Sequence, residues 1–308
     1  MYICALGFED GSLGSNIALK EKNFKTKKSL IIKYDSYVKD NEKDKKRLEG
    51  IWNDFSDEIQ YVEYIADNRN QSIQNLLEKL ESLKLESKNV TINISSFKTH
   101  AQVWLLNYAF DNFENTKIIY SEPEDYGDQS QSENVYASGV KEIFTMPEFS
   151  GAILPGYSSL LVIFLGYDFV RAGETYEHIQ PSKKIGIMGE PNTKGLASRF
   201  KKIKTKHKLN FRSIDEIIKL SIFNLKNLIE ELEKIRSTNI EKCNISFALN
   251  GSKLHSIAAI LFAKKFKDIQ VVMSTPISYF PKNFSKGVNR TFELTVKRNW
   301  LEKFLENR

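Results

Sequence analysis

The stretches Ile94-Ser95-Ser96-Phe97-Lys98-Thr99-His100 and Leu249-Asn250-Gly251-Ser252-Lys253-Leu254-His255 are two versions of one pattern. In each, a run of β-branched and apolar residues gives way to small polar residues and then to a helical stretch. This transition is typical of the strand-to-helix turns of α/β proteins. The pattern occurs twice, 155 residues apart, with a histidine in the same place. The chain is therefore predicted to contain an internal repeat.

Four further pairs of segments match in the same order, and their offset never rises along the chain. They are residues 4–9 with 163–168, 30–35 with 185–190, 118–126 with 271–279, and 138–140 with 286–288. The segment from Met146 to Gly156 is rich in Pro and Gly, as linkers are. We therefore predict two copies of one unit, copy one over residues 1–151 and copy two over residues 152–308.

Within each copy, short apolar runs alternate with helical stretches, which indicates an α/β fold with a mostly parallel sheet covered by helices on both faces. The prediction is two tandem Rossmann-like domains. The expected strands lie near residues 2–8, 29–34, 60–66, 89–95 and 116–121, and near 160–166, 184–188, 208–213, 243–249 and 270–275. A last strand, near 142–146 or 291–296, is expected to close the sheet of its own copy. Leucine and isoleucine stripes predict helices over residues 70–85 and 214–235.

The composition, with 41% hydrophobic and 27% charged residues, fits a globular protein. The longest apolar run, Leu160 to Phe169, is interrupted by Gly166 and Asp168 and is too short for a membrane span. The start of the chain lacks the pattern of a secretory signal. Cys4 and Cys243 lie in strand-like runs and are expected to be reduced core thiols. These features predict a cytoplasmic protein without a membrane partner.

The net charge of +6 is unevenly distributed. Residues 1–150 hold 18 Lys and Arg against 25 Asp and Glu, a net charge of −7, and residues 151–308 hold 27 against 14, a net charge of +13. The split indicates either attraction between the halves or an anionic ligand on the second half, unless it is a drift of solvated surface charge.

In open α/β sheets, ligands bind beyond the carboxyl ends of the strands. This rule selects Glu9, Ser95, Ser96 and Lys98 in copy one, and Asp168, Arg171, Glu190, Asn250, Gly251, Ser252 and Lys253 in copy two. The turn from Asn250 to Lys253 offers backbone amides, a hydroxyl and an ammonium group to an anion such as phosphate. An ordinary turn capped by Ser252 would have the same sequence.

The sequence holds no motif for a P-loop, a dinucleotide site, a zinc site or a hydrolase nucleophile, so no cofactor and no metal are expected. His100 and His255 could act as general bases, but local packing or hydrogen bonding is the simpler explanation of both. Glu122, Glu124 and Asp125 could hold a metal or a ribose hydroxyl, or form a solvated turn. A basic segment could contact nucleic-acid backbone or be ordinary surface; it contains Arg199, Lys201, Lys202, Lys204, Lys206 and Lys208.

The tandem layout and the turns Ser95-Ser96-Phe97-Lys98 and Asn250-Gly251-Ser252-Lys253 resemble the CRISPR-associated Rossmann-fold (CARF) sensors and the related SAVED domains of prokaryotic antiviral defence. In that family the ends of the first and fourth strands line a groove that holds a cyclic or linear oligonucleotide. The resemblance implies contacts from Glu9, Asp10, Ser95, Ser96, Lys98, Asp168, Arg171, Asn250, Ser252 and Lys253. The chain departs from the family in lacking an evident effector domain and in its acidic first copy.

We therefore expect a non-hydrolytic sensor or regulatory subunit that binds an anionic, nucleotide-like ligand. The signal would pass to a partner protein that carries the effector activity. Two alternatives remain: an enzyme that acts on a nucleotide or sugar phosphate through Glu9, Asp168 or a histidine, and an interaction subunit whose ligand site has decayed.

Overall fold

The computed structural model describes residues 1–7, 10–34, 42–84, 87–126, 137–190, 201, 203–205, 207, 216–279 and 285–306. The chain forms two compact units. Unit 1 comprises Met1–Gly127 and Ser285–Asn307, and unit 2 comprises Asp128–Phe284 and Arg308. Both are α/β units with a six-stranded sheet, as the sequence predicts.

The sheet of unit 1 has the strand order β14-β5-β4-β1-β2-β3. Five strands are parallel, and only β14 at the edge runs antiparallel, to β5. The strands are β1 (Tyr2–Leu6), β2 (Thr26–Tyr34), β3 (Ser56–Tyr64), β4 (Asn89–Asn93), β5 (Asn115–Glu122) and β14 (Arg290–Lys297). The consecutive buried residues Leu30, Ile31 and Ile32 show that both faces of the sheet are covered.

The sheet of unit 2 repeats this layout, with the order β10-β9-β8-β11-β12-β7. Again five strands are parallel and one edge strand, β7, runs antiparallel to its neighbour β12. The strands are β8 (Ser158–Leu165), β9 (Lys183–Glu190), β10 (Glu216–Ser221), β11 (Cys243–Asn250), β12 (Ile269–Tyr279) and β7 (Ala137–Thr145). In both sheets the strand order reverses beside the first strand, which makes the units Rossmann-like.

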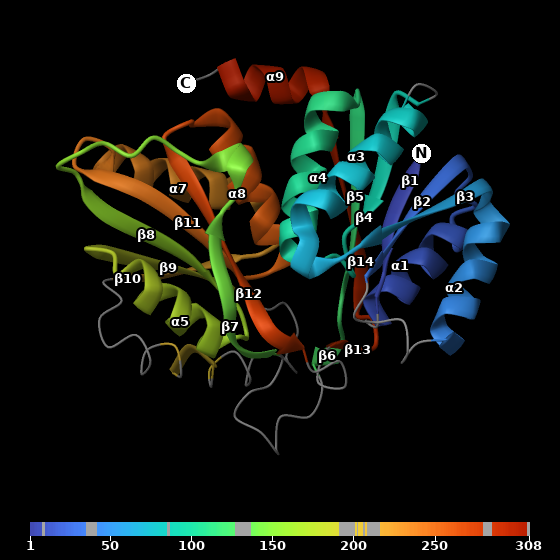
Figure 1. The fold of residues 1–308 in the computed structure, drawn as a ribbon, viewed down its shortest axis with the longest axis horizontal. Helices are drawn as coiled ribbons and strands as arrows, with labels where there is room; N and C mark the ends of the chain where they lie inside the picture. Colours follow the sequence, from blue (N-terminus) through green and yellow to red (C-terminus); the bar gives the residue numbers. More distant parts are fainter. Residues whose placement is uncertain are drawn as a thin grey trace. The chain divides into compact units, whose positions relative to one another are not determined.

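Helices cover both faces of each sheet (Figure 1). In unit 1, α1 (Asp10–Glu21) and α2 (Glu42–Phe55) lie on one face, and α3 (Arg69–Lys84) and α4 (Thr99–Asn112) lie on the other. In unit 2, α5 (Phe169–Ile179) lies opposite α7 (Leu225–Asn239) and α8 (Lys253–Lys265). The short elements are η2 (Ala66–Asn68), η3 (Pro147–Phe149), the β6 (Asp125–Tyr126) and β13 (Ser285–Lys286) pair, and the C-terminal helix α9 (Arg298–Glu306).

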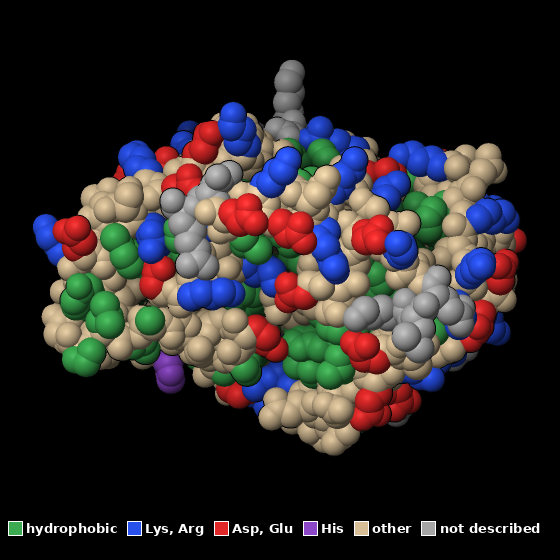
Figure 2. Space-filling view, turned by 90° about the horizontal axis from the view of Figure 1, so that it is seen from above, with side chains coloured by type: hydrophobic (Ala, Val, Ile, Leu, Met, Phe, Trp, Pro, Cys, Tyr) green, Lys and Arg blue, Asp and Glu red, His purple; other side chains and the backbone are tan. Residues whose placement is uncertain are grey.

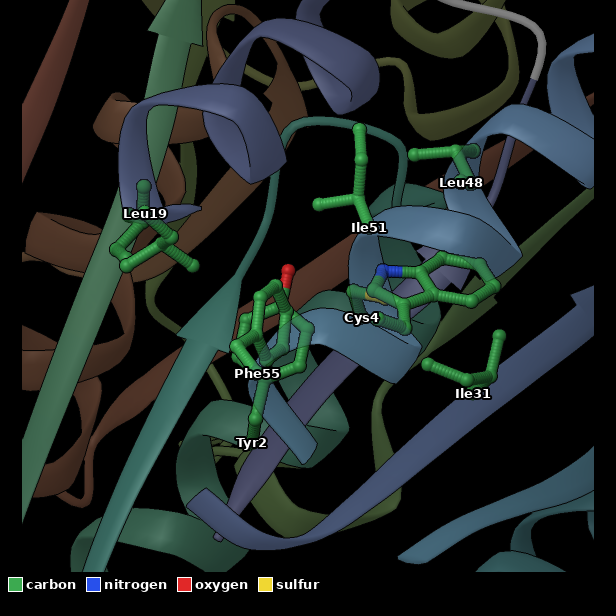
Figure 3. Packing of buried hydrophobic residues seen from close by; sticks show 9 residues of the cluster. Tyr2, Cys4, Leu19, Ile31, Leu48, Ile51 and Phe55 are labelled. Atoms are coloured by element: carbon green, nitrogen blue, oxygen red, sulfur yellow. The ribbon is translucent and has the colours of Figure 1, made fainter. Parts of the chain in front are cut away.

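The core of unit 1 between the sheet and helices α1 and α2 is rich in aromatic side chains (Figure 3). The Tyr2 and Phe55 rings pack edge to face with centroids 5.2 Å apart. The Tyr2 hydroxyl and the Trp52 indole both donate to Asn16 Oδ1 at 2.8 Å. Cys4 lies in this core, and both it and Cys243 are free and buried, as expected.

Each of the two antiparallel edge strands belongs to the other unit than the one expected from the sequence. We expected a strand near residues 142–146 to close the sheet of copy one and a strand near 291–296 to close that of copy two. Instead β7 pairs with β12 of unit 2, and β14 pairs with β5 of unit 1. The compact units therefore differ from the contiguous segments 1–151 and 152–308 by an exchange of edge strands.

Polar pairs explain why β14 belongs beside β5. The carboxylate of Glu122, at the end of β5, is buried and accepts from Arg290 Nε at 3.1 Å and Asn289 Nδ2 at 2.9 Å. Without these partners the burial of this charge would be costly. On the same pair of strands, Glu293 binds Lys117 at 2.7 Å.

Strand β10 corrects a second expectation, the helix predicted over residues 214–235. Residues 208–213, where a strand was predicted, lie outside the described residues, and β10 begins at Glu216. The predicted helix over residues 214–235 starts later, because Asn224 caps α7: its side chain accepts from the backbone amide of Asn227 at 3.1 Å. Ile218 therefore lies in a strand and not on the helical stripe.

The exchange also reduces the charge split. Counted by compact unit, unit 1 holds 22 Lys and Arg against 24 Asp and Glu, a net charge of −2, and unit 2 holds 23 against 15, a net charge of +8. Figure 2 shows side chains of both signs interspersed over the face in view. Among the helices that the structure describes, none is long and apolar enough to cross a membrane.

Candidate ligand site at the strand ends

The turn after the fourth strand packs directly on a glycine after the first strand, in both units. A Cβ atom at Gly7, after β1, would lie 2.4 Å from Ser96 Cβ, and one at Gly166, after β8, would lie 2.6 Å from the Asn250 carbonyl oxygen. Each contact lies where the strand order reverses, which is where ligands bind in open α/β sheets. The structure therefore brings Ser95 and Ser96 to the end of β1, and Asn250 and Gly251 to the end of β8.

Asp168 and Arg171 form a local unit at the start of α5. The Asp168 carboxylate caps the helix by accepting from the Arg171 backbone amide at 3.0 Å. Its second oxygen lies 3.2 Å from Arg171 Nε, and the Arg171 side chain is 17% exposed. Among the described residues, the Arg171 guanidinium interacts with Asp168 through this ion pair. Its terminal nitrogens remain suited to an anion that approaches the strand ends.

The other copy-two candidates have different surroundings. Ser252 caps α8, since its hydroxyl accepts from the His255 backbone amide at 3.2 Å. Lys253 is the first residue of that helix and is partly buried. Glu190 is the exposed last residue of β9.

Asn250 is part of a buried hydrogen-bond network. Ser274 Oγ donates to Asn250 Oδ1 at 3.0 Å, and Asn250 Nδ2 donates to Thr175 Oγ1 at 3.1 Å. Thr175 in turn donates to the Arg171 carbonyl oxygen at 2.7 Å. Asn250 is 2% exposed, so its side chain faces the interior, where it holds the turn in place, and not the solvent.

Unit 1 contains an equivalent network of hydroxyl groups. Ser15 Oγ donates to the Gly11 carbonyl oxygen at 2.8 Å, and lies 2.8 Å from Ser95 Oγ and 2.6 Å from Ser121 Oγ. Because its one proton is used, Ser95 and Ser121 must donate to Ser15. Thr291 of β14, 2.8 Å from Ser121 Oγ, must then donate to Ser121. In both units the network joins the fifth strand, the fourth-strand end and the first helix.

Sequence reasoning selected Ser95 and Asn250 as ligand contacts and missed the hydroxyl groups that engage them, on Ser15, Ser121, Thr175, Ser274 and Thr291. The matched offsets gave a signal for one pair: Ser121 and Ser274 are 153 residues apart, the offset of the matched segments 118–126 and 271–279. Ser15 and Thr175 lie outside the matched segments.

Lys98 occupies a different environment from Lys253. Its side chain is 9% exposed, and its ammonium group lies 4.9 Å from the centroid of the Tyr34 ring. Its backbone amide donates to the Tyr34 hydroxyl at 3.0 Å. Among the described residues, no side chain caps α4, which begins after Lys98. Glu9 lies outside the described residues, as does the side chain of Asp10.

Three buried histidines lie near the strand ends. His100 packs its ring against Tyr64, with centroids 5.3 Å apart. His255 packs against Phe164, with centroids 5.6 Å apart. No sequence pattern singled out the third, His207. Its Nε2 donates to the Gly166 carbonyl oxygen at 2.7 Å, and burial lowers its pKa.

His207 belongs to the basic segment that we considered for nucleic-acid binding. Lys201 and Lys204 are the two of its six cations that the structure describes. At the acidic turn, the Glu122 carboxylate is buried and accepts from Arg290 and Asn289 through Oε2.

No family model and no curated protein sequence matches this chain. Its fold is similar to that of a Type III CRISPR defence DNA nuclease activated by cyclic oligoadenylate, with a TM-score of 0.54 and 9% sequence identity. The match covers 85% of this chain and 63% of that one, so this chain spans less than two thirds of its length. The cytoplasmic domain of a prokaryotic cation chloride cotransporter matches over 89% of this chain and 95% of that one, at 8% identity and a TM-score of 0.28. The likeness to the CRISPR nuclease is one of fold, the two-sheet α/β layout.

Proposed function

We propose that this chain is a sensor that binds an anionic, nucleotide-like molecule at the carboxyl ends of its strands and signals to a partner protein in antiviral defence. The observation that carries the proposal is the position of Arg171. Its guanidinium lies in the first turn of α5, next to the strand-order reversal of unit 2, and pairs with Asp168 through Nε. Unit 2 is also the basic unit, which concentrates anions near it.

The likeness of fold supports this choice of ligand class. The CRISPR nuclease is activated by cyclic oligoadenylate, a molecule with several phosphates and nucleosides. An Arg171 fork and the Lys253 ammonium at neighbouring strand ends would suit the phosphates of such a ligand. Glu190 and Ser252 border the same strand ends, and Ser96 and Lys98 would serve a corresponding site in unit 1. The matched networks in the two units also support an origin by internal duplication.

The test is calorimetry of the full chain with cyclic oligoadenylates of several ring sizes. Losing one charged hydrogen bond costs about 1.5–3 kcal/mol, so Arg171→Ala and Lys253→Ala should weaken binding about 10- to 150-fold. Lys226→Ala, which removes a charge from the exposed surface of α7, is the control and should bind like the wild type. If Lys98→Ala alone weakens binding, the site lies in unit 1. If no oligoadenylate binds, the proposal is wrong.

A second candidate, an interaction subunit with a decayed ligand site, is favoured by the inward bonding of Ser95 and Asn250. That function predicts that neither oligoadenylates nor pyrophosphate bind. The enzyme alternative finds less support, because Asp168, one of its candidate acids, caps α5 and is paired with Arg171.

A further inference from the structure

We infer that His255 is a specificity-determining residue of the ligand site of unit 2, where its ring hydrogen-bonds the nucleoside part of the ligand. The inference rests on the proposed function and adds a residue that reads an uncharged part of the ligand.

The first step concerns the state of the imidazole. The His255 side chain is 1% exposed. Neither Nδ1 nor Nε2 has a hydrogen-bond partner among the residues that the structure describes. Nearly all buried polar groups in folded proteins are bonded, so an imidazole with two unbonded nitrogens is exceptional. The cost of keeping it unbonded is recovered when a ligand supplies the partner.

The second step concerns its position. The ring lies against Phe164 of β8 and between the ends of β9 and β11. A Cβ atom at Gly189 would stand 2.9 Å from His255 Cε1, and one at Gly251 would stand 3.0 Å from Nδ1. Both glycines are partly exposed. The imidazole therefore packs directly against two partly exposed glycines at the strand ends, where neither residue has a side chain to stand between the ring and a ligand.

The third step concerns the chemistry that this ring recognises. Burial lowers the pKa of His255 to about 4, so the ring is neutral near pH 7. A neutral imidazole has one donor and one acceptor and no charge to attract phosphate. It therefore complements a base edge or a sugar hydroxyl, while Arg171 and Lys253 provide the positive charge.

The experiment compares His255→Leu with the wild type, using cyclic oligoadenylates and inorganic pyrophosphate as probes. Leu is close to His in volume and removes both nitrogens. We expect the affinity for the oligoadenylate to fall at least about fivefold, while that for pyrophosphate stays unchanged. The ligand-free variant should melt about 2–4 °C higher, because an unbonded polar group has been removed. His100→Leu, at the corresponding place in unit 1, is the control and should not alter binding by unit 2.

The outcomes separate the two proposals. If the wild type binds the oligoadenylate and His255→Leu binds it equally well, the role of His255 is wrong and the proposed function stands. Weaker binding together with a lower melting temperature would mean that His255 is structural. If the wild type binds no probe, the proposed function fails and this inference with it.

Two conservative variants keep the test valid if His255→Leu does not fold. His255→Asn offers a polar group near Nδ1, and His255→Gln offers one near Nε2. We expect one of them to bind the oligoadenylate within about threefold of the wild type and the other to bind more weakly. Equal binding by both would overturn the inference.

Discussion

The Ser96 side chain lies directly over Gly7, so that a Cβ atom at Gly7 would stand 2.4 Å from Ser96 Cβ and 2.8 Å from its Oγ. In unit 2 the corresponding glycine, Gly166, lies beneath the Asn250 carbonyl oxygen. The absence of a side chain after the first strand is thus what lets the fourth-strand turn close over it. Both contacts lie at the reversal of strand order, where the ligand is proposed to bind.

This contact predicts that Gly7→Ala and Gly166→Ala destabilise the protein. Each methyl group would displace a turn that is held by buried hydrogen bonds, at a cost of about 1–3 kcal/mol. The free energy of unfolding in urea measures the effect. The matched controls are Gly50→Ala in α2 and Gly173→Ala in α5, where a Cβ atom meets nothing within 4 Å. These should stabilise their helices by about 0.5–1 kcal/mol. Equal stability of all four variants would contradict the prediction.

The sequence predicted these turns because their signals are local. Ile94 to His100 and Leu249 to His255 each combine a strand end, small polar residues and a helix start, and both turns lie where the pattern puts them. The hydrogen-bond partners of the side chains in these turns are distant in sequence. Asn250 is bonded to Thr175 and Ser274, which are 75 and 24 residues away, and no spacing rule reveals such partners.

The edge strands show the same limit on a larger scale. The residues of β7 and β14 were predicted as strands, but both β5 and β12 offer an open edge to an antiparallel neighbour. The choice depends on pairs such as Glu122 with Arg290, 168 residues apart. The stripe through Ile218 failed for another reason: apolar residues four apart suit a helix as well as a strand and the turn after it.

The exchange of edge strands predicts a specific cross-link. Thr295 of β14 is the register partner of Lys117 of β5. The variant carrying Lys117→Cys and Thr295→Cys should therefore form an intramolecular disulfide under mild oxidation, which thiol counting and mass spectrometry detect. Each single variant is a control, because Cys4 and Cys243 are buried. Failure of the double variant to close the bond would argue that β14 pairs elsewhere.

The buried network of unit 2 predicts that Thr175→Val lowers the free energy of unfolding, although valine and threonine have nearly the same shape. Valine fills the same volume but leaves Asn250 Nδ2 without an acceptor, which should cost about 1–3 kcal/mol of unfolding free energy. Thr175→Ser keeps the hydroxyl and should cost less. If the two variants are equally stable, the hydroxyl does not hold the Asn250 turn.

His255 predicts a loss of stability at mildly acidic pH. Its pKa is about 4 in the folded protein and 6.5 in an unperturbed chain, because burial disfavours the charged ring. Between these values the unfolded state binds more protons, so stability rises with pH, is fully present above about pH 6.5, and is lost as the pH falls toward 4. The contribution amounts to about 3 kcal/mol.

Urea unfolding at pH 7.5 and 5 should show a smaller difference in unfolding free energy for His255→Leu than for the wild type. The remaining slope would include His207, whose pKa is also lowered. His178→Gln, on the exposed surface of α5, is the control and should keep the wild-type difference. An unchanged difference in His255→Leu would show that the ring is not neutral and buried in solution, and would remove the chemical basis for its role in reading the ligand.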